Sequence, residues 1–215
     1  MRKLGQYALL LDPRDYRAMP WKNGRGVTRE IAVFPPHSAL VGQSFLWRIS
    51  LADVTRDCEF SSFPGYDRSL MLTEGAGMEL VFDAAPAVVI RDRYAPVLFS
   101  GDWQAHCRLL NGALQDFNVM TARAQLSHTC EVVRRYPHAI AWQPRSETLM
   151  VYCCKGAVIL DGVYGRQIAL EAEHTLLLQP HAGAAASASL QMSAMSGDAV
   201  ALVIRIIPLI LVGHC

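Results

Sequence analysis

The chain has 215 residues, of which 52% are hydrophobic and only 18% are charged. An ordinary domain carries about 25% charged residues, so this composition excludes disorder for most of the chain and predicts a sizeable core. The formal net charge is +1, which leaves no global field to draw the protein onto DNA, RNA or an anionic membrane. We therefore expect neither a nucleic acid nor a membrane among its partners.

The sequence predicts no targeting or membrane-spanning segment. The apolar stretch at residues 7–11 is too short for a signal peptide. Residues 199–213 are apolar but contain Arg205 and Pro208, whereas a membrane-spanning helix needs about 20 apolar residues. The six cysteines include no C-x-x-C pair, which favours small buried residues in a reducing compartment over disulfides or a zinc site. We therefore expect a cytoplasmic protein.

The elements predicted along the chain are nearly all strands. One short helix is predicted around residues 12–17, with Asp12 as its cap. After it, apolar and β-branched runs recur between Gly, Pro, Asn and Asp, which is typical of an all-β sandwich or barrel. The predicted strands of the first half are 28–34, 45–54, 69–73, 77–82, 87–90, 97–100, 105–110 and 115–121. A polar break at 123–129 precedes those of the second half, which are 131–136, 149–154, 157–161, 174–179, 186–192 and 199–207.

The two halves resemble each other. Residues 68–75 and 149–156 each form an apolar strand that ends in a charged residue and a glycine and leads into another strand. Each is followed by a later strand with its own turn, at 97–102 and 174–180. Any two hairpins could share this pattern, but it favours two jelly-roll-like barrels in tandem. We assign residues 1–124 to a first barrel that holds a ligand pocket and residues 125–215 to a second.

The segment 20–34 is the first informative motif. Gly24 and Gly26 allow a tight turn with positive φ or a close backbone approach to a ligand. Arg29 shares a strand face with Val27 and Ile31, so it lies in an apolar row. A buried arginine costs several kcal/mol unless it is paired. It therefore meets a carboxylate of the protein or of a ligand, unless it lies at the surface of an edge strand.

Two more arginines interrupt apolar strands. Arg68 shares a face with Leu70, Leu72 and Glu74, and Arg48 follows a tryptophan. The natural internal partners of these arginines are Glu30, Glu74 and Asp116. If every arginine is paired, the cluster is structural. If one is left over, the interior of the first barrel is an anion site, because a guanidinium holds a carboxylate bidentately.

Metal, cofactor and nucleophile motifs do not occur. The seven histidines form no H-x-H, H-x-x-x-H or H-E-x-x-H spacing, and His106 beside Cys107 would face the opposite side of a strand. The sequence also contains no G-x-S-x-G, no Walker loop and no G-x-G-x-x-G. We therefore expect neither a metal nor a cofactor.

Several motifs together resemble the HutD/Ves family. They are Trp21-Lys-Asn-Gly-Arg-Gly-Val-Thr-Arg-Glu-Ile31, Phe45-Leu-Trp-Arg-Ile-Ser50, Phe60, Phe63-Pro-Gly-Tyr-Asp-Arg68, Glu74-Gly75, Cys107-Arg-Leu109 and Asp116-Phe-Asn118. The likeness covers residues 20–120 and rests beyond them on length and strand pattern. It implies a metal-free, cupin-type fold with two barrels. It also implies a protein that binds a small carboxylate of histidine breakdown, such as urocanate or formylglutamate, and acts as a regulator.

The residue pattern and the resemblance together give the candidate ligand-binding residues. These are Trp21, Lys22, Asn23, Thr28, Arg29, Glu30, Arg48, Arg68 and Asn118. The arginines would hold the anion, Trp21 would pack on the flat part of the ligand, and the two asparagines would supply neutral hydrogen bonds.

Three functions compete, and we favour the small-carboxylate sensor. The second is a metal-independent isomerase or hydrolase acting on a related acid, with Glu30, Glu74 or His106 as general base. The third is a subunit-interaction module whose barrel interior is filled by side chains. A homodimer would cover exposed edges of the barrels.

Overall fold

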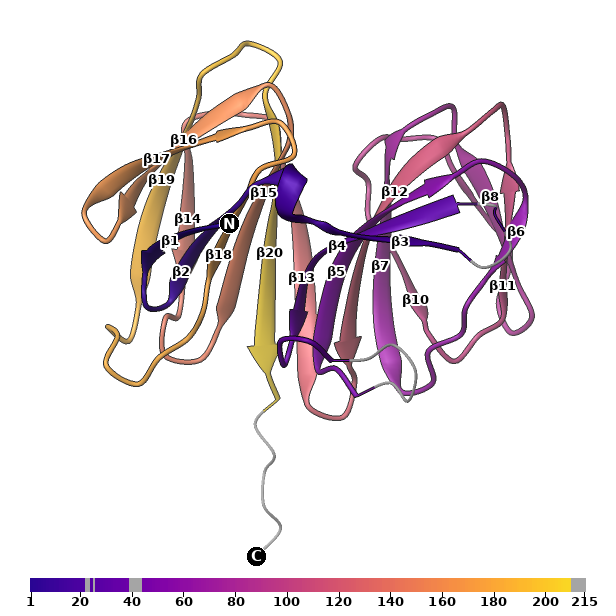
Figure 1. Cartoon of the computed structure of the whole chain (residues 1–215), viewed down its shortest axis with the longest axis horizontal. Helices are drawn as coiled ribbons and strands as arrows, with labels where there is room; N and C mark the ends of the chain where they lie inside the picture. The colour runs from indigo at the N-terminus through magenta and orange to yellow at the C-terminus, as the bar shows by residue number, and fades with distance from the viewer. Residues whose placement is uncertain (22–23, 25, 39–43, 210–215) are drawn as a thin grey trace, which may run out of the picture. The chain divides into compact units, whose positions relative to one another are not determined.

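The computed structural model describes residues 1–21, 24, 26–38 and 44–209, and their regular structure is almost entirely β-strand (Figure 1). This confirms the predicted all-β class. The chain divides into two compact units. The first unit is Tyr16–Ser127, and the second combines Met1–Asp15 with the chain from His128 onward. No helix in the described part of the chain is long and apolar enough to cross a membrane.

The first unit consists of two antiparallel sheets with the core between them. Leu70 and Leu72 of one sheet pack in the same core cluster as Leu80 of the other. The six-stranded sheet has the order β10 (Val97–Ser100), β7 (Tyr66–Glu74), β12 (Leu114–Ala122), β5 (Trp47–Val54), β4 (Gly26–Phe34) and β3 (Arg17–Pro20). The four-stranded sheet has the order β6 (Cys58–Phe60), β11 (Ala105–Leu109), β8 (Met78–Phe82) and β9 (Val88–Ile90).

The second unit also has a six-stranded and a four-stranded sheet. The larger has the order β1 (Arg2–Gly5), β2 (Ala8–Leu11), β18 (Thr175–Leu178), β15 (Thr148–Lys155), β20 (Val200–Pro208) and β13 (Leu126–Val133). The smaller has the order β14 (His138–Trp142), β19 (Ala188–Ala194), β16 (Ala157–Val163) and β17 (Arg166–Glu171). Aliphatic side chains from both sheets, among them Val151, Leu160 and Val203, form its core.

The strand order is the same in the two units. The run β10-β7-β12-β5 matches β18-β15-β20-β13, and β6-β11-β8-β9 matches β14-β19-β16-β17. The similar segments 68–75 and 149–156 fall on β7 and β15, which hold equivalent places in their sheets. The sequence similarity between the halves therefore corresponds to a repeated arrangement of eight strands, to which each unit adds two more.

The first fifteen residues differ from the prediction, which assigned them to the first barrel. They form β1 and β2, and β2 pairs with β18 of the second unit, with Ala8 opposite Leu178. The physical reason is burial, since the fully buried Ala8 packs in the core of the second unit. The predicted helix is a single 3-10 turn at Pro13–Asp15, where the Asp12 carboxylate accepts a hydrogen bond from the backbone N–H of Arg14 at 2.9 Å.

The central strands of the first unit's larger sheet are buried on both faces. On β5 and β12, neighbouring residues such as Leu51 and Ala52, or Phe117 and Asn118, are all buried although they point to opposite sides. Strands of this kind show little alternation of polar and apolar residues. Their sequence tells which side chains share a face, but not which face borders a cavity.

Candidate functional site

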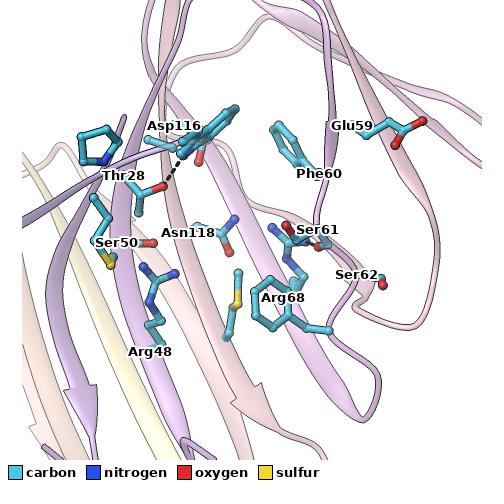
Figure 2. Close-up of a pocket in the computed structure, with 16 residues that line it drawn as sticks. Thr28, Arg48, Ser50, Glu59, Phe60, Ser61, Ser62, Arg68, Asp116 and Asn118 are labelled. Atoms are coloured by element: carbon cyan, nitrogen blue, oxygen red, sulfur yellow. Dashed lines mark hydrogen bonds between the residues drawn. The ribbon is translucent and has the colours of Figure 1, made fainter. Parts of the chain in front are cut away.

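A cavity of about 580 Å³ lies inside the first unit. Apolar side chains, including Trp21, Phe60, Phe63 and Met120, form part of its wall. The polar residues that line it are Thr28, Arg48, Ser50, Glu59, Ser61, Ser62, Arg68, Asp116 and Asn118 (Figure 2). A largely apolar pocket with a few convergent polar groups is the usual form of a small-molecule site.

The floor of the cavity is a ladder of three rungs across β5, β12 and β7. In each rung a residue of β12 is flanked by its antiparallel partners on the two neighbouring strands. The rungs are Arg48 with Met120 and Arg68; Ser50 with Asn118 and Leu70; and Ala52 with Asp116 and Leu72. Because residues two apart share a face and the rise is 3.3–3.4 Å per residue, neighbouring rungs lie about 7 Å apart. Cationic, amide and acidic side chains thus follow one another along the floor.

Arg68 is a buried cation, with only 4% of its surface exposed. Its Nη1 donates to the backbone oxygen of Ser61 at 3.1 Å, and its guanidinium lies 4.8 Å from the ring centre of Phe99. Its Nε has no hydrogen-bond partner among the described residues. Burial lowers its pKa to about 10, an effect that the nearby charge of Arg48 reinforces and that of Asp116 opposes. It therefore stays protonated at neutral pH.

Arg48 is buried as well, but it already has an acidic partner. Its Nε donates to Glu30 Oε2 at 2.7 Å, and both side chains are buried. Its Nη2 is buried without a hydrogen-bond partner in the described part of the chain. The Glu30 carboxylate thus balances one of the two cations, and Arg48 Nη2 has no hydrogen bond to a described residue.

Asp116 and Asn118 supply acceptors in the same cavity. Asp116 is 1% exposed, and neither of its carboxyl oxygens has a hydrogen-bond partner among the residues described. The amide oxygen of Asn118 is likewise buried without such a partner. Burial raises the pKa of Asp116 to about 7; the charge of Arg68 opposes this rise and that of Asp53 adds to it. Asp116 therefore changes its protonation state near neutral pH.

The glycine-containing turn positions Trp21 at the cavity. Trp21 Nε1 donates to Thr28 Oγ1 at 2.8 Å, which fixes the indole ring (Figure 2). Gly24 has a φ of 67°, a conformation that favours glycine. A Cβ on Gly26 would lie 2.5 Å from the backbone oxygen of Asp53 and 3.1 Å from the Trp21 ring, so only glycine fits there. Gly24 thus has the positive φ that the sequence suggested, whereas Gly26 permits a close approach to Asp53 and Trp21 of the protein itself.

The structure brings five of the nine candidate residues together. Those that line the cavity are Trp21, Thr28, Arg48, Arg68 and Asn118. Glu30 lies behind Arg48 as its ion-pair partner. Arg29 does not line the cavity, because it is a neighbour of Thr28 and points to the opposite face, where it pairs with Asp53 at 3.5 Å. Lys22 and Asn23 lie outside the described residues.

Asp116 is the main residue that the prediction missed. From the sequence it is expected only as an internal partner for the arginines. The alternation of the predicted strand 115–121 already placed it in the same row as Asn118, and this was the signal available. Ser50, Phe60 and Met120 also line the cavity and carried no motif signal of their own.

No group of three His, Cys, Asp or Glu side chains in the described residues could hold a metal ion. The polar groups of the cavity are instead arginine donors and carboxyl and amide acceptors. These groups suit an organic ligand that carries both an anionic group and hydrogen-bonding groups.

Two antiparallel sheets with a core between them, in the same strand order in both units, define the class as a cupin-type β protein. A solved cupin 2 conserved barrel domain protein from Leptotrichia buccalis has a TM-score of 0.54, covers 86% of this chain and 89% of its own, and is 11% identical, so it shows the fold alone. The HutD family model matches residues 13–196. The chain belongs to the HutD family, as the sequence motifs predicted.

Named relatives agree with this assignment. An uncharacterised 21.2 kDa protein from the region 3′ of hutC in Pseudomonas putida is 42% identical over 53% of this chain and 57% of its own. The protein Ves of Citrobacter koseri is 36% identical over 56% of this chain and 63% of its own. The chain thus spans about three fifths of the length of these two relatives. The solved HutD of Pseudomonas fluorescens SBW25 is 26% identical, with a TM-score of 0.76 over 94% of this chain and 99% of its own.

Proposed function

We propose that the first unit binds a small carboxylate of histidine breakdown, such as urocanate or formylglutamate, without a metal, and that the protein acts as a regulator in histidine utilisation. Membership of the HutD family, which is associated with histidine utilisation, supports the ligand class. The two buried arginines that line the cavity support a carboxylate as part of the ligand. Its volume of about 580 Å³ suits a small molecule.

The main support for the proposal is the burial of Arg68 together with its Nε, which has no hydrogen-bond partner among the described residues. Glu30 pairs with the other buried cation, Arg48. A buried charge is costly unless it is paired. A ligand carboxylate between the two guanidinium groups would accept hydrogen bonds from Arg68 Nε and Arg48 Nη2. Each such bond contributes about 1.5–3 kcal/mol, so two of them and a ring packed on Trp21 would support roughly micromolar binding.

The test is calorimetric titration of the chelator-treated protein with urocanate and with formylglutamate. We expect micromolar binding of at least one acid, and a loss of about 100-fold in Arg68→Leu, because a charged hydrogen bond and the positive charge are both removed. Arg108→Leu is the matched control, since Arg108 is 58% exposed, pairs with Glu79 and lies outside the cavity. Unchanged affinity in Arg68→Leu, or no heat at protein concentrations that reveal millimolar binding, would overturn the proposal.

A second candidate is a metal-independent enzyme, and Asp116 is the observation that favours it. A carboxyl group with a pKa near 7 inside a cavity is suited to general acid–base catalysis. The bases suggested by the sequence are less well placed, because Glu30 is held by Arg48 while Glu74 and His106 do not line the cavity. Turnover of histidine-pathway acids that is lost in Asp116→Asn would establish this candidate. The cavity beside Arg68 weighs against the third hypothesis, a filled barrel that serves only subunit contact.

A further inference from the structure

The acceptors of the cavity point to a second feature of the ligand. The carboxylate proposed above would use the donors on Arg48 and Arg68. It would leave both oxygens of Asp116 and the oxygen of Asn118 without a hydrogen atom to accept, since none has a partner among the described residues. Asp116 is 1% exposed and lines the cavity. A ligand that carries a hydrogen-bond donor would supply these acceptors with a partner.

The acceptors and the donors occupy different parts of the floor. Asp116 lies four residues along β12 from Met120, whose rung carries both arginines, so the two rungs are about 13 Å apart at 3.3–3.4 Å per residue. Figure 2 shows Asn118 between Arg48 and Arg68, with Asp116 beyond it at the upper edge of the cavity. The long arginine side chains shorten the distance that a ligand must bridge. A small molecule can therefore contact the arginines with one end and Asp116 with the other.

The charges of the site determine which chemical group suits the end of the ligand that lies beside Asp116. Among the buried side chains of the site, Arg48 and Arg68 carry two positive charges, and Glu30 and an ionised Asp116 carry two negative ones. A ligand that brings only a carboxylate adds a third negative charge and gives Asp116 no donor. A ligand that also brings an N–H group gives Asp116 a hydrogen bond that is strengthened by the charge of the carboxylate.

We propose that Asp116 selects ligands that carry an N–H donor at the end opposite their carboxylate, with Asn118 as a second acceptor. This inference rests on the proposed function, because it concerns the same cavity. Asp116 is thereby the specificity-determining residue of the site, and simple carboxylic acids of the same shape bind less tightly.

Two acids of matched shape test this selection. Urocanate carries an imidazole N–H, and 3-(furan-3-yl)acrylate has the same acrylate on a five-membered ring without an N–H. At pH 8 we expect the wild-type protein to bind urocanate at least 10-fold more tightly in calorimetric titrations. In Asp116→Ala we expect the two affinities to agree within 3-fold, because urocanate loses its acceptor while furanylacrylate loses an unfavourable neighbour. Asp53→Asn is the control for charge, since Asp53 does not line the cavity, and it keeps the preference.

The outcomes separate this inference from the proposed function. Equal binding of the two acids by the wild-type protein overturns the selection by Asp116 but not the proposed carboxylate site. Binding of neither acid overturns both. A preference that survives in Asp116→Ala also overturns the role of Asp116. If that variant does not fold, Asp116→Asn keeps the shape of the side chain, and there a preference reduced at least 3-fold is expected.

Discussion

The two units have the same strand order but different interiors. In the second unit, Leu149, Val151 and Val203 of the corresponding sheet are all buried in one aliphatic cluster. In the first unit, the corresponding strands carry charged and amide side chains around a cavity. Both units share the strand order, so the strand order alone does not account for the cavity. The side chains on β5, β7 and β12 of the first unit distinguish it.

The pairing of the strands allows the two floors to be compared position by position. On β15, Leu149, Val151 and Cys153 correspond to Arg68, Leu70 and Leu72 of β7 by the repeat in the sequence. Through their partners, Val203 then corresponds to Asn118 and Ala201 to Asp116. The equivalent positions are thus Arg68 and Leu149, Asn118 and Val203, and Asp116 and Ala201. The first unit carries polar groups at these three positions and the second carries apolar ones, whereas at a fourth position Met120 corresponds to Arg205, which pairs with Glu131 at 3.5 Å. The three positions distinguish the first unit as the candidate binding unit.

The largest expected effect comes from placing a polar group in the second unit. Val203→Asn buries an amide in an aliphatic cluster that offers it no partner, so we expect a loss of about 2–4 kcal/mol in the free energy of unfolding. The reverse change, Asn118→Val, removes an unpartnered oxygen and is expected to be nearly neutral. Denaturant unfolding followed by circular dichroism measures both. Equal losses in the two variants would show that the interiors do not differ in the way described.

Transferring the second unit's residues into the first is the next test. In the double variant Arg68→Leu/Asp116→Ala, two buried charged groups are replaced by apolar ones, which is often neutral or stabilising by about 1–3 kcal/mol. We expect a protein of equal or higher thermal stability that no longer binds the acids. A stability loss of several kcal/mol would mean that these side chains hold the fold together rather than serve a ligand.

The pH dependence of stability sharpens the comparison, because only one of the two equivalent positions titrates. The pKa of Asp116 is about 7 in the folded protein, against an ordinary value of 3.8 for an aspartate. Between these values the folded state holds a proton that the unfolded state releases, so the stability from this group falls as the pH rises from about 4 to 7. The loss is about 1.4 kcal/mol per pH unit within that window. We expect Asp116→Asn to flatten this slope, whereas identical pH profiles would contradict the burial of an ionisable Asp116.

The smallest expected effect on ligand affinity comes from Thr28, which lies in the wall of the cavity beside Trp21. Thr28→Val removes the acceptor of Trp21 Nε1 and keeps the volume of the side chain, so we expect a cost of about 1 kcal/mol, or a roughly 5-fold weaker binding of the acids. Thr28→Ser keeps the hydroxyl and serves as the control in the same titrations. Equal affinity in both variants would mean that the orientation of Trp21 does not matter for binding.

The sequence predicted the features that depend on local pattern. The alternation in 68–75 placed Arg68 with Leu70 and Leu72 on the interior face, and the repeat identified β7 and β15 as equivalent. The glycine turn after Trp21 followed from the freedom and small size of glycine alone.

The features that the sequence did not predict depend on tertiary packing. Arg29 was expected beside the other arginines, yet it lies on the half-buried β4 and points to the face opposite the cavity, where it pairs with Asp53. Asp116 was expected as an internal partner of the arginines; its charge does act on Arg68, but no hydrogen bond joins it to a described residue. The sequence also could not show that Ala8 and its neighbours join the second unit, because that pairing bridges most of the chain.

A crystal structure of the protein soaked with urocanate would test the central claim most directly. The account predicts the carboxylate between Arg48 and Arg68, the imidazole N–H toward Asp116 and no ligand within the second unit. Urocanate bound elsewhere on the molecule, with the cavity of the first unit unchanged, would contradict it.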